Sequence, residues 1–205
     1  MLISERHAFI FIHIYKTAGT SVTEALRPFC KENRWIPAIS VLFNKRDSPR
    51  LPCHATAADV IAANGRKWWD RFFTFAFVRN PWDREVSIYN YVLQQESHDW
   101  HERIKGFGSF DRYIRWACAH DDVHSQGGFI YSNSGELLVD FVGRYETIES
   151  DFQAVCNQIG VKAELPKLNV SNNNNRPYRE CYTSVTRDLV GKALSSDIKL
   201  FGYGF

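Results

Sequence analysis

Two continuous apolar runs along the chain have the length of buried β-strands. They are AFIFIHI over Ala8–Ile14 and FFTFAFV over Phe72–Val78, and VDFVGRYE over Val139–Glu146 predicts a third strand. Strands that are buried on both faces of a parallel sheet read as continuous rather than alternating apolar runs. The pattern therefore predicts a buried, mostly parallel sheet.

Polar capping residues predict helices between these strands. Ser21 and Glu24 match a capping box that opens a helix to about Leu26, while Thr56 and Asp59 match a second box. This second helix is expected to end at a glycine, Gly65. Further caps, or apolar residues spaced by three and four, predict helices over Asn80–Gln95, Ser109–Ala119, Glu149–Ile159 and Ser184–Ser195.

Two segments show neither pattern. Residues 31–51 are expected to form a loop with at most one short strand, Ile39–Phe43, and residues 169–179, with four consecutive asparagines, a second loop. No repeat or linker interrupts the alternation of strands and capped helices. We therefore expect one domain over residues 1–205, of the α/β class, with a central, mostly parallel sheet flanked by helices. Such sheets bind ligands at the carboxyl ends of their strands.

Composition narrows the class of protein. The chain has 205 residues, 44% of them hydrophobic, and no apolar run approaches the roughly 20 residues of a membrane-spanning helix. Residues 1–7 contain Glu5 and Arg6 and do not match a secretory signal. The five cysteines are far apart and lack zinc-site spacing. These features predict a reduced, cytoplasmic protein with no membrane span and no metal site.

The charge of the chain is nearly balanced, at a net +2. A general nucleic-acid binder usually has a strong basic excess, so no nucleic-acid partner is expected. Residues 1–90 hold 13 basic and 8 acidic side chains, a net +5, whereas residues 91–205 hold 12 and 15, a net −3. A basic first part suits an anionic ligand bound there. Chance variation over a solvated surface explains the same numbers.

The turn after the first predicted strand has the components of an anion site. It reads HIYKTAGTS from His13 to Ser21, with Lys16 and Gly19 ahead of a helix start. Backbone N–H groups at a helix N-terminus, with a lysine and hydroxyls nearby, can bind a phosphate. The order differs from a Walker A loop because Lys16 precedes the glycine. The alternative is an ordinary turn in which Ser21 caps the helix and Lys16 is solvated.

The turn after the second predicted strand carries an arginine and a serine. Arg79 follows the strand, and Ser87 lies eight residues further on, about 80° away on the same side of a helix. This pair can hold a phosphate monoester. Alternatively, Arg79 pairs with Asp83 and Ser87 is a neutral helix residue. Two such turns at the ends of strands in one sheet suggest a ligand with two separate anionic groups.

These motifs resemble the sulfotransferases that use 3′-phosphoadenosine 5′-phosphosulfate (PAPS). IFIHIYKTAGTS resembles their 5′-phosphosulfate loop, and FAFVRNPWDREVSIYNY resembles their 3′-phosphate segment. The similarity continues through VGRYETIESDF and LPKLN…YRECY…DIKLFGY, in the order of the family. The branch in question includes Golgi carbohydrate sulfotransferases and small bacterial relatives. The resemblance covers nearly the whole chain and implies a P-loop-like three-layer sandwich.

The resemblance also implies roles for particular residues. Those matching the 5′-phosphosulfate loop are Lys16, Thr17, Ala18, Gly19, Thr20 and Ser21. Arg79 and Ser87 match the pair that holds the 3′-phosphate, and His54 matches the histidine that is the catalytic base in several members. The chain departs from the family at Tyr15, where proline is common, and in the asparagine-rich loop.

Two histidines are candidates for the base. His54 stands two residues before the predicted N-cap Thr56, and the positive end of that helix disfavours a protonated imidazole, as a base requires. The alternative for His54 is an exposed or structural histidine. His13 is a rival, but its place in a strand predicts a role in the core or beside the site.

The implied reaction is transfer of a sulfuryl group from PAPS to an acceptor hydroxyl, with 3′,5′-bisphosphorylated adenosine as product. His54 would be the base, Lys16 would stabilise the leaving phosphate, and no metal is required. The expected acceptor is a carbohydrate or glycolipid, and a homo-oligomer is left open. Trp100 and Trp116 either line the acceptor pocket or pack in the core. The alternative functions are a P-loop-like nucleotide-dependent kinase and a non-catalytic nucleotide-binding module.

Overall fold

The computed structural model describes residues 1–30, 54–166 and 176–205. The described residues form two compact units. Unit 1 lies within Met1–Val78 and Gly128–Asn169, and unit 2 lies within Arg79–Gly127 and Val170–Phe205. The short strand expected over 39–43 and the asparagine run fall outside the described residues.

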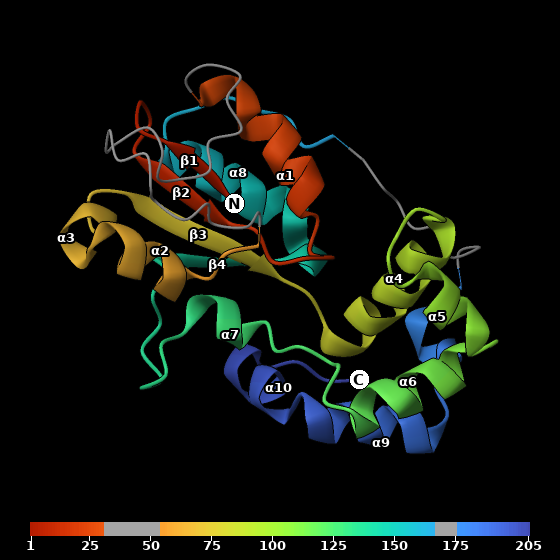
Figure 1. Ribbon diagram of the computed structural model, residues 1–205. Coiled ribbons are helices and arrows are strands. Elements are labelled where there is room, and N and C mark those ends of the chain that lie inside the picture. Colours follow the sequence, from red (N-terminus) through yellow and green to blue (C-terminus); the bar gives the residue numbers. More distant parts are fainter. Residues whose placement is uncertain (31–53, 167–175) are drawn as a thin grey trace. The chain divides into compact units, whose positions relative to one another are not determined.

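Unit 1 contains a mixed sheet with the order β1-β2-β3-β4 among its described residues (Figure 1). The strands are β1 (Leu2–Ser4), β2 (Phe9–Ile12), β3 (Phe73–Val78) and β4 (Phe141–Arg144). β1 pairs antiparallel with β2, and the other pairs are parallel. The α/β class and the mostly parallel sheet are therefore confirmed. The sequence pattern did not predict β1, whose three residues are too few to show a periodicity.

The predicted strand over Ala8–Ile14 is shorter in the structure, because Ala8 adopts a left-handed φ of 49° and β2 ends at Ile12. Its residues alternate between the two faces of the sheet. Phe9 and Phe11 pack on one face with phenylalanines of β3, and Ile10 and Ile12 are buried on the other. Burial on both faces explains the continuous apolar run.

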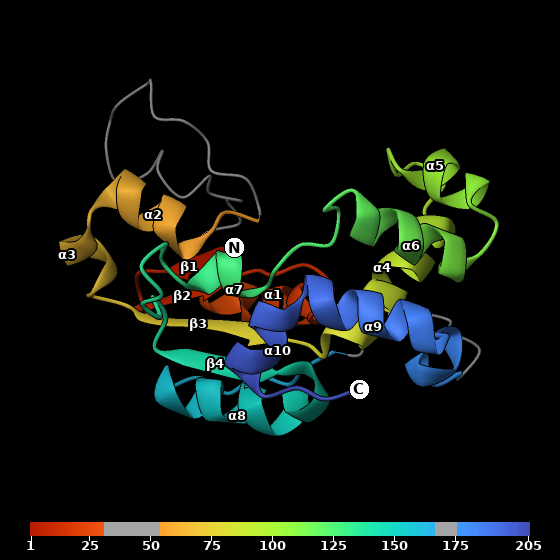
Figure 2. The same ribbon diagram turned by 90° about the horizontal axis from the view of Figure 1, so that it is seen from below.

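Helices cover both faces of this sheet. On the phenylalanine face lie α1 (Gly19–Leu26) and α8 (Ile148–Gln158), which contribute Val22, Leu26, Phe152 and Val155 to the core. The views of Figure 1 and Figure 2 place α2 (Ala57–Asn64) and α3 (Arg66–Trp69) on the opposite side of the sheet from α8. Helix–sheet–helix layering is the architecture that the sequence predicted.

Unit 2 is helical among its described residues. Its elements are α4 (Pro81–Gln94), α5 (His101–Gly106), α6 (Phe110–Ala119), η3 (Tyr178–Cys181), α9 (Ser184–Ala193) and α10 (Ser195–Phe201). Trp82, Ile114 and Val190 are buried together in its core. Short elements complete the described chain: η1 (Arg27–Phe29), α7 (Gly127–Ile130) and η2 (Tyr145–Thr147).

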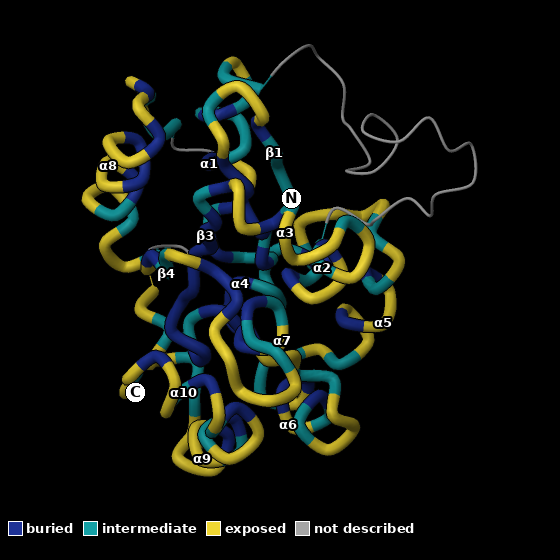
Figure 3. Tube along the Cα trace, turned by 90° about the vertical axis from the view of Figure 1, so that its left-hand side faces the viewer, coloured by how far each residue is buried: buried dark blue, intermediate teal, exposed yellow. Residues whose placement is uncertain are grey.

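The predicted starts of α2, α4 and α6 are confirmed. Thr56 and Asp59 form the predicted capping box of α2, and Asn80 and Ser109 cap α4 and α6. The exposed sides of α8 and α9 are yellow in Figure 3, as their amphipathic spacing requires. The helix predicted over Ser184–Ser195 is confirmed as α9, which ends at Ala193, and the sequence did not predict α10, which follows from Ser195.

Candidate functional site

The loop between β2 and α1 has an unusual backbone. Lys16 and Ala18 both adopt left-handed conformations, with φ of 66° and 65°. Such values are uncommon outside glycine and concentrate at binding sites, where the surrounding structure holds them in place. Alternation of backbone conformation in a turn can direct successive N–H groups toward one point, which suits an anion. Lys16 is half-buried within this loop.

Helix α1 begins earlier than the sequence predicted. Its N-cap is Ala18, and no side chain caps it there. The predicted capping box of Ser21 and Glu24 is therefore wrong, since Ser21 lies inside the first turn and Glu24 forms an ion pair with Arg27. The left-handed residue at Ala18 starts the helix in place of a polar cap. The N-terminal N–H groups of α1 consequently face the loop without a capping side chain.

Thr17 and Gly19 shape the loop in different ways. The Thr17 hydroxyl is fully buried and donates a hydrogen bond of 2.7 Å to the Ile14 carbonyl, so this side chain holds the turn closed. A Cβ on Gly19 would clash with ring atoms of His13. Glycine is thus required at this position because an imidazole ring occupies the space of a side chain.

The structure brings His54 to the base of the same loop. His54 Nδ1 lies 2.9 Å from the carbonyl oxygen of His13. A carbonyl can only accept a hydrogen bond, so Nδ1 carries the proton and Nε2 of the neutral ring has a free lone pair. The His54 ring also meets Tyr15 edge-on, with centroids 5.7 Å apart. This tautomer is the one that a general base acting through Nε2 needs.

His13 lies between the loop and His54. Its ring centroid is 4.8 Å from that of His54, and its ring stacks on Phe11. Burial, and after it the positive charge of the chain's N-terminus, lowers the pKa of His13 to about 3. A ring with this pKa stays neutral and is a poor base at neutral pH. The position of His13 thus agrees with the prediction that this residue lies in the core or beside the site.

Arg79 and Ser87 belong to unit 2 and are both buried, with 8% and 3% of their surfaces exposed. Arg79 lies just before the N-cap Asn80, and Ser87 lies within α4. Arg79 Nε donates to Asp83 Oδ2 at 2.7 Å, so the ion pair that was the alternative interpretation does form. This carboxylate fixes one side of the guanidinium plane.

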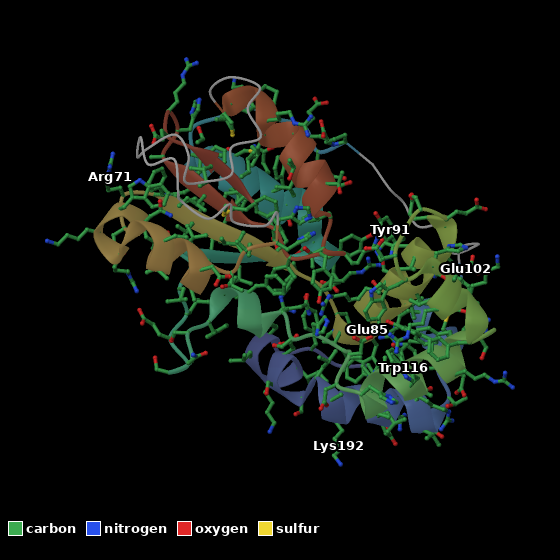
Figure 4. All side chains as sticks on the ribbon, in the orientation of Figure 1. Arg71, Glu85, Tyr91, Glu102, Trp116 and Lys192 are labelled. Carbon is green, nitrogen blue, oxygen red and sulfur yellow. The ribbon has the colours of Figure 1, made fainter. Side chains whose placement is uncertain are left out.

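Two further charged residues of α4 are buried, Arg84 and Glu85, of which Glu85 is labelled in Figure 4. Arg84 Nη1 donates to the His124 carbonyl at 2.7 Å. Among the described residues, neither carboxylate oxygen of Glu85 has a hydrogen-bond partner. Burial raises the pKa of Glu85 to about 7, against the opposing effect of Arg84. The sequence did not single out these residues, since charges in a helix normally indicate a solvated face.

Trp100 and Trp116 both lie half-buried in unit 2. The Arg103 guanidinium is 4.1 Å from the ring centroid of Trp116, which also stacks on His120 at 4.9 Å. Side chains of the protein itself therefore lie against Trp116 (labelled in Figure 4). This packing fits the alternative interpretation, in which Trp116 packs against other side chains, better than an open platform for stacking on a sugar.

In residues 1–30, 54–166 and 176–205, no group of three or more His, Cys, Asp or Glu side chains is arranged to hold a metal ion. Within the same described ranges, no helix is long and apolar enough to cross a membrane.

Comparison with known proteins identifies the family of the chain. A family model described as "Sulfotransferase family" matches residues 1–204, and the chain belongs to this family. An uncharacterized protein of Archaeoglobus fulgidus is 29% identical over 113 residues, which are 54% of this chain and 88% of that protein. No solved structure matches the chain.

Proposed function

We propose that this protein is a PAPS-dependent sulfotransferase that transfers a sulfuryl group to an acceptor hydroxyl. The observation that carries the proposal is the loop after β2, where left-handed Lys16 and Ala18 lead into a helix start without a side-chain cap. β2 and β3 are adjacent and parallel, so their carboxyl ends lie at one edge of the sheet. Arg79 follows β3 directly. Membership of the sulfotransferase family supports the class of reaction.

The two segments are assigned to different groups of the donor. The 5′-phosphosulfate is assigned to the loop and first turn that comprise Lys16, Thr17, Ala18, Gly19, Thr20 and Ser21. Thr17 takes part through its backbone, because its hydroxyl is committed to Ile14. The 3′-phosphate is assigned to the Arg79 guanidinium and the Ser87 hydroxyl. A backbone cradle suits a group that must leave, and a charged side chain suits a fixed anchor.

His54 and Lys16 carry the chemistry in this proposal. His54 Nε2 removes the proton of the acceptor hydroxyl as the acceptor oxygen forms its bond to sulfur. The bond from sulfur to the 5′-phosphate oxygen breaks, and its electron pair stays on that oxygen. The Lys16 ammonium and the α1 N–H groups stabilise the charge that develops there. The Nδ1–H bond to the His13 carbonyl supports this role, because it fixes the tautomer.

The acceptor is assigned to the hydroxyl-bearing carbohydrates or glycolipids on the resemblance alone. A screen of such acceptors with labelled PAPS tests this part. Transfer of label to a carbohydrate hydroxyl is the expected result, and transfer only to phenols or simple alcohols would contradict it. The single domain over residues 1–205 and the cytoplasmic location both stay predictions.

Nucleotide-dependent stabilisation tests the class of donor. Thermal unfolding is measured with 3′,5′-bisphosphorylated adenosine and, separately, with ATP and Mg²⁺. We expect the bisphosphate to raise Tm and ATP–Mg²⁺ to have little effect. Stabilisation by ATP–Mg²⁺ alone would overturn the proposal in favour of a kinase. Stabilisation by the bisphosphate without label transfer to any acceptor would favour a binding module.

A further inference from the structure

A buried carboxylate in unit 2 organises the turn ahead of α7. Asp197 of α10 is fully buried. Its Oδ1 accepts hydrogen bonds from the Ser125 hydroxyl at 2.5 Å and the Gly127 N–H at 3.0 Å, and its Oδ2 accepts one from the Gln126 N–H at 2.6 Å. Three donors compensate the burial of the carboxylate. The backbone of Gln126 is thereby held on both sides of its Cα.

The side chain of Gln126 in turn holds the main chain of Arg79. Gln126 is fully buried, and its Oε1 accepts a hydrogen bond from the Arg79 N–H at 2.8 Å. Its Nε2 donates to the Arg79 carbonyl at 2.8 Å. One amide therefore satisfies both backbone groups of a single residue, as a paired strand would. Glutamate lacks the donor, and an aliphatic side chain lacks both groups.

These bonds act where the chain turns from β3 into α4. Beyond Arg79, Asn80 caps α4 through Oδ1 and donates from Nδ2 to the Gly204 carbonyl at 2.8 Å. The direction in which the Arg79 side chain leaves the backbone is therefore fixed from both sides. A buried guanidinium has few alternative rotamers, so an error in the backbone direction displaces it from its ligand.

We propose that Gln126, held by Asp197, is a positioning residue that sets the preference of the protein for nucleotides with a 3′-phosphate. The inference rests on the proposed function, because it takes Arg79 as the 3′-phosphate ligand. Gln126 does not touch the nucleotide and acts through the backbone of Arg79. Its contribution therefore falls on binding of the 3′-phosphate and not on the 5′ end.

The test compares two nucleotides on one variant. Dissociation constants are measured for 3′,5′-bisphosphorylated adenosine and for adenosine 5′-monophosphate, and their ratio is the readout. Gln126→Met keeps the length of the side chain and removes both hydrogen bonds. We expect the ratio to fall by about tenfold, with the affinity for the monophosphate changed less than about twofold. Gln153→Met, on the exposed side of α8, is the matched control and should leave both constants unchanged.

The outcomes separate the inference from the proposed function. If the unmodified protein does not prefer the bisphosphate, the proposed function fails and the inference falls with it. If the preference exists and Gln126→Met retains it, the inference alone is overturned. If Gln126→Met does not fold, Asp197→Asn is measured in its place, because it weakens the support of Gln126 while keeping the shape. An unchanged ratio in folded Asp197→Asn likewise overturns the inference.

Discussion

The two segments assigned to PAPS, the backbone segment after β2 and the side-chain segment after β3, are proposed to bind it through different kinds of group. In the backbone segment, the proposed hydrogen-bonding groups are backbone N–H groups. Their positions are set by the left-handed Lys16 and Ala18 and by the packing of Gly19 on His13. After β3 the assigned groups are buried side chains, of which Arg79 has its backbone fixed by two hydrogen bonds with the Gln126 amide. A backbone site depends on the shape of its loop and is broken by steric conflict. A side-chain site depends on charge and on the contacts that aim it.

The largest expected effect lies beside the backbone segment, in His54→Ala. Loss of the base should lower kcat by about 10²–10⁴-fold. The dissociation constant of 3′,5′-bisphosphorylated adenosine should stay within about twofold, because the loop and its N–H groups remain. Steady-state kinetics and calorimetric titration measure the two quantities. His7→Ala, in the turn between β1 and β2, is the control. Retained kcat in His54→Ala would remove this residue from the mechanism.

The side-chain segment has a buried acid that the backbone segment lacks. Burial raises the pKa of Glu85 from 4.5 to about 7, a difference worth about 3 kcal/mol. The folded protein keeps this proton up to about pH 7, whereas the unfolded chain loses it near 4.5. The free energy of unfolding should therefore be highest below pH 4.5, fall as the pH rises to about 7, and then level off.

Urea unfolding from pH 4.5 to 8 measures this dependence. Glu85→Gln should flatten the fall by up to about 3 kcal/mol, because the amide stays neutral at every pH. The groups whose charge bears on Glu85 are Arg84, Asp122 and Asp197, and they remain in the variant. Glu102→Gln, at an exposed position of α5, should leave the dependence as it is. Parallel curves for the protein and Glu85→Gln would show that Glu85 is ionised in the folded state.

A steric change should break the backbone segment. In Gly19→Ala the new Cβ meets the His13 ring, whose carbonyl also holds His54. We expect a loss of about 1–3 kcal/mol in the free energy of unfolding and at least about tenfold weaker nucleotide binding. Gly106→Ala is the matched control, since nothing lies within 4 Å of its added Cβ. Equal stability and affinity in the two variants would show that His13 yields without consequence.

Local signals predicted the parts of the fold that depend on a few neighbouring residues. The caps Thr56 and Asn80 marked the starts of α2 and α4 because a capping side chain contacts the backbone two or three residues away. The predicted start of α1 was wrong because the helix begins after a left-handed residue, Ala18. No residue type in the turn indicates that backbone conformation. The capping rule therefore pointed to the nearest serine.

Contacts between residues that are far apart in the chain could not be predicted from the sequence. The hydrogen bond from Gln126 to Asp197 joins residues 71 positions apart, and the bonds between Gln126 and Arg79 join residues 47 positions apart. Gln126 lies in no motif, and Asp197 opens the segment DIKLFGY of the family resemblance, to which no ligand role was assigned. The sequence thus identified the side chains proposed to meet the donor, while the groups that aim them became visible only through tertiary packing.

The smallest expected effect sharpens the assignment of the two segments. Arg79→Lys keeps the charge and loses the planar fork that binds a phosphate through two hydrogen bonds. The preference for 3′,5′-bisphosphorylated adenosine over the 5′-monophosphate should fall by about tenfold. Lys16→Gln is the counterpart after β2, and it should lower kcat while leaving that preference unchanged, since the 3′-phosphate does not involve Lys16. The reverse pattern, with the preference lost in Lys16→Gln and kept in Arg79→Lys, would exchange the two assignments. A backbone cradle would then anchor the 3′-phosphate, and the buried arginine would face the 5′ end.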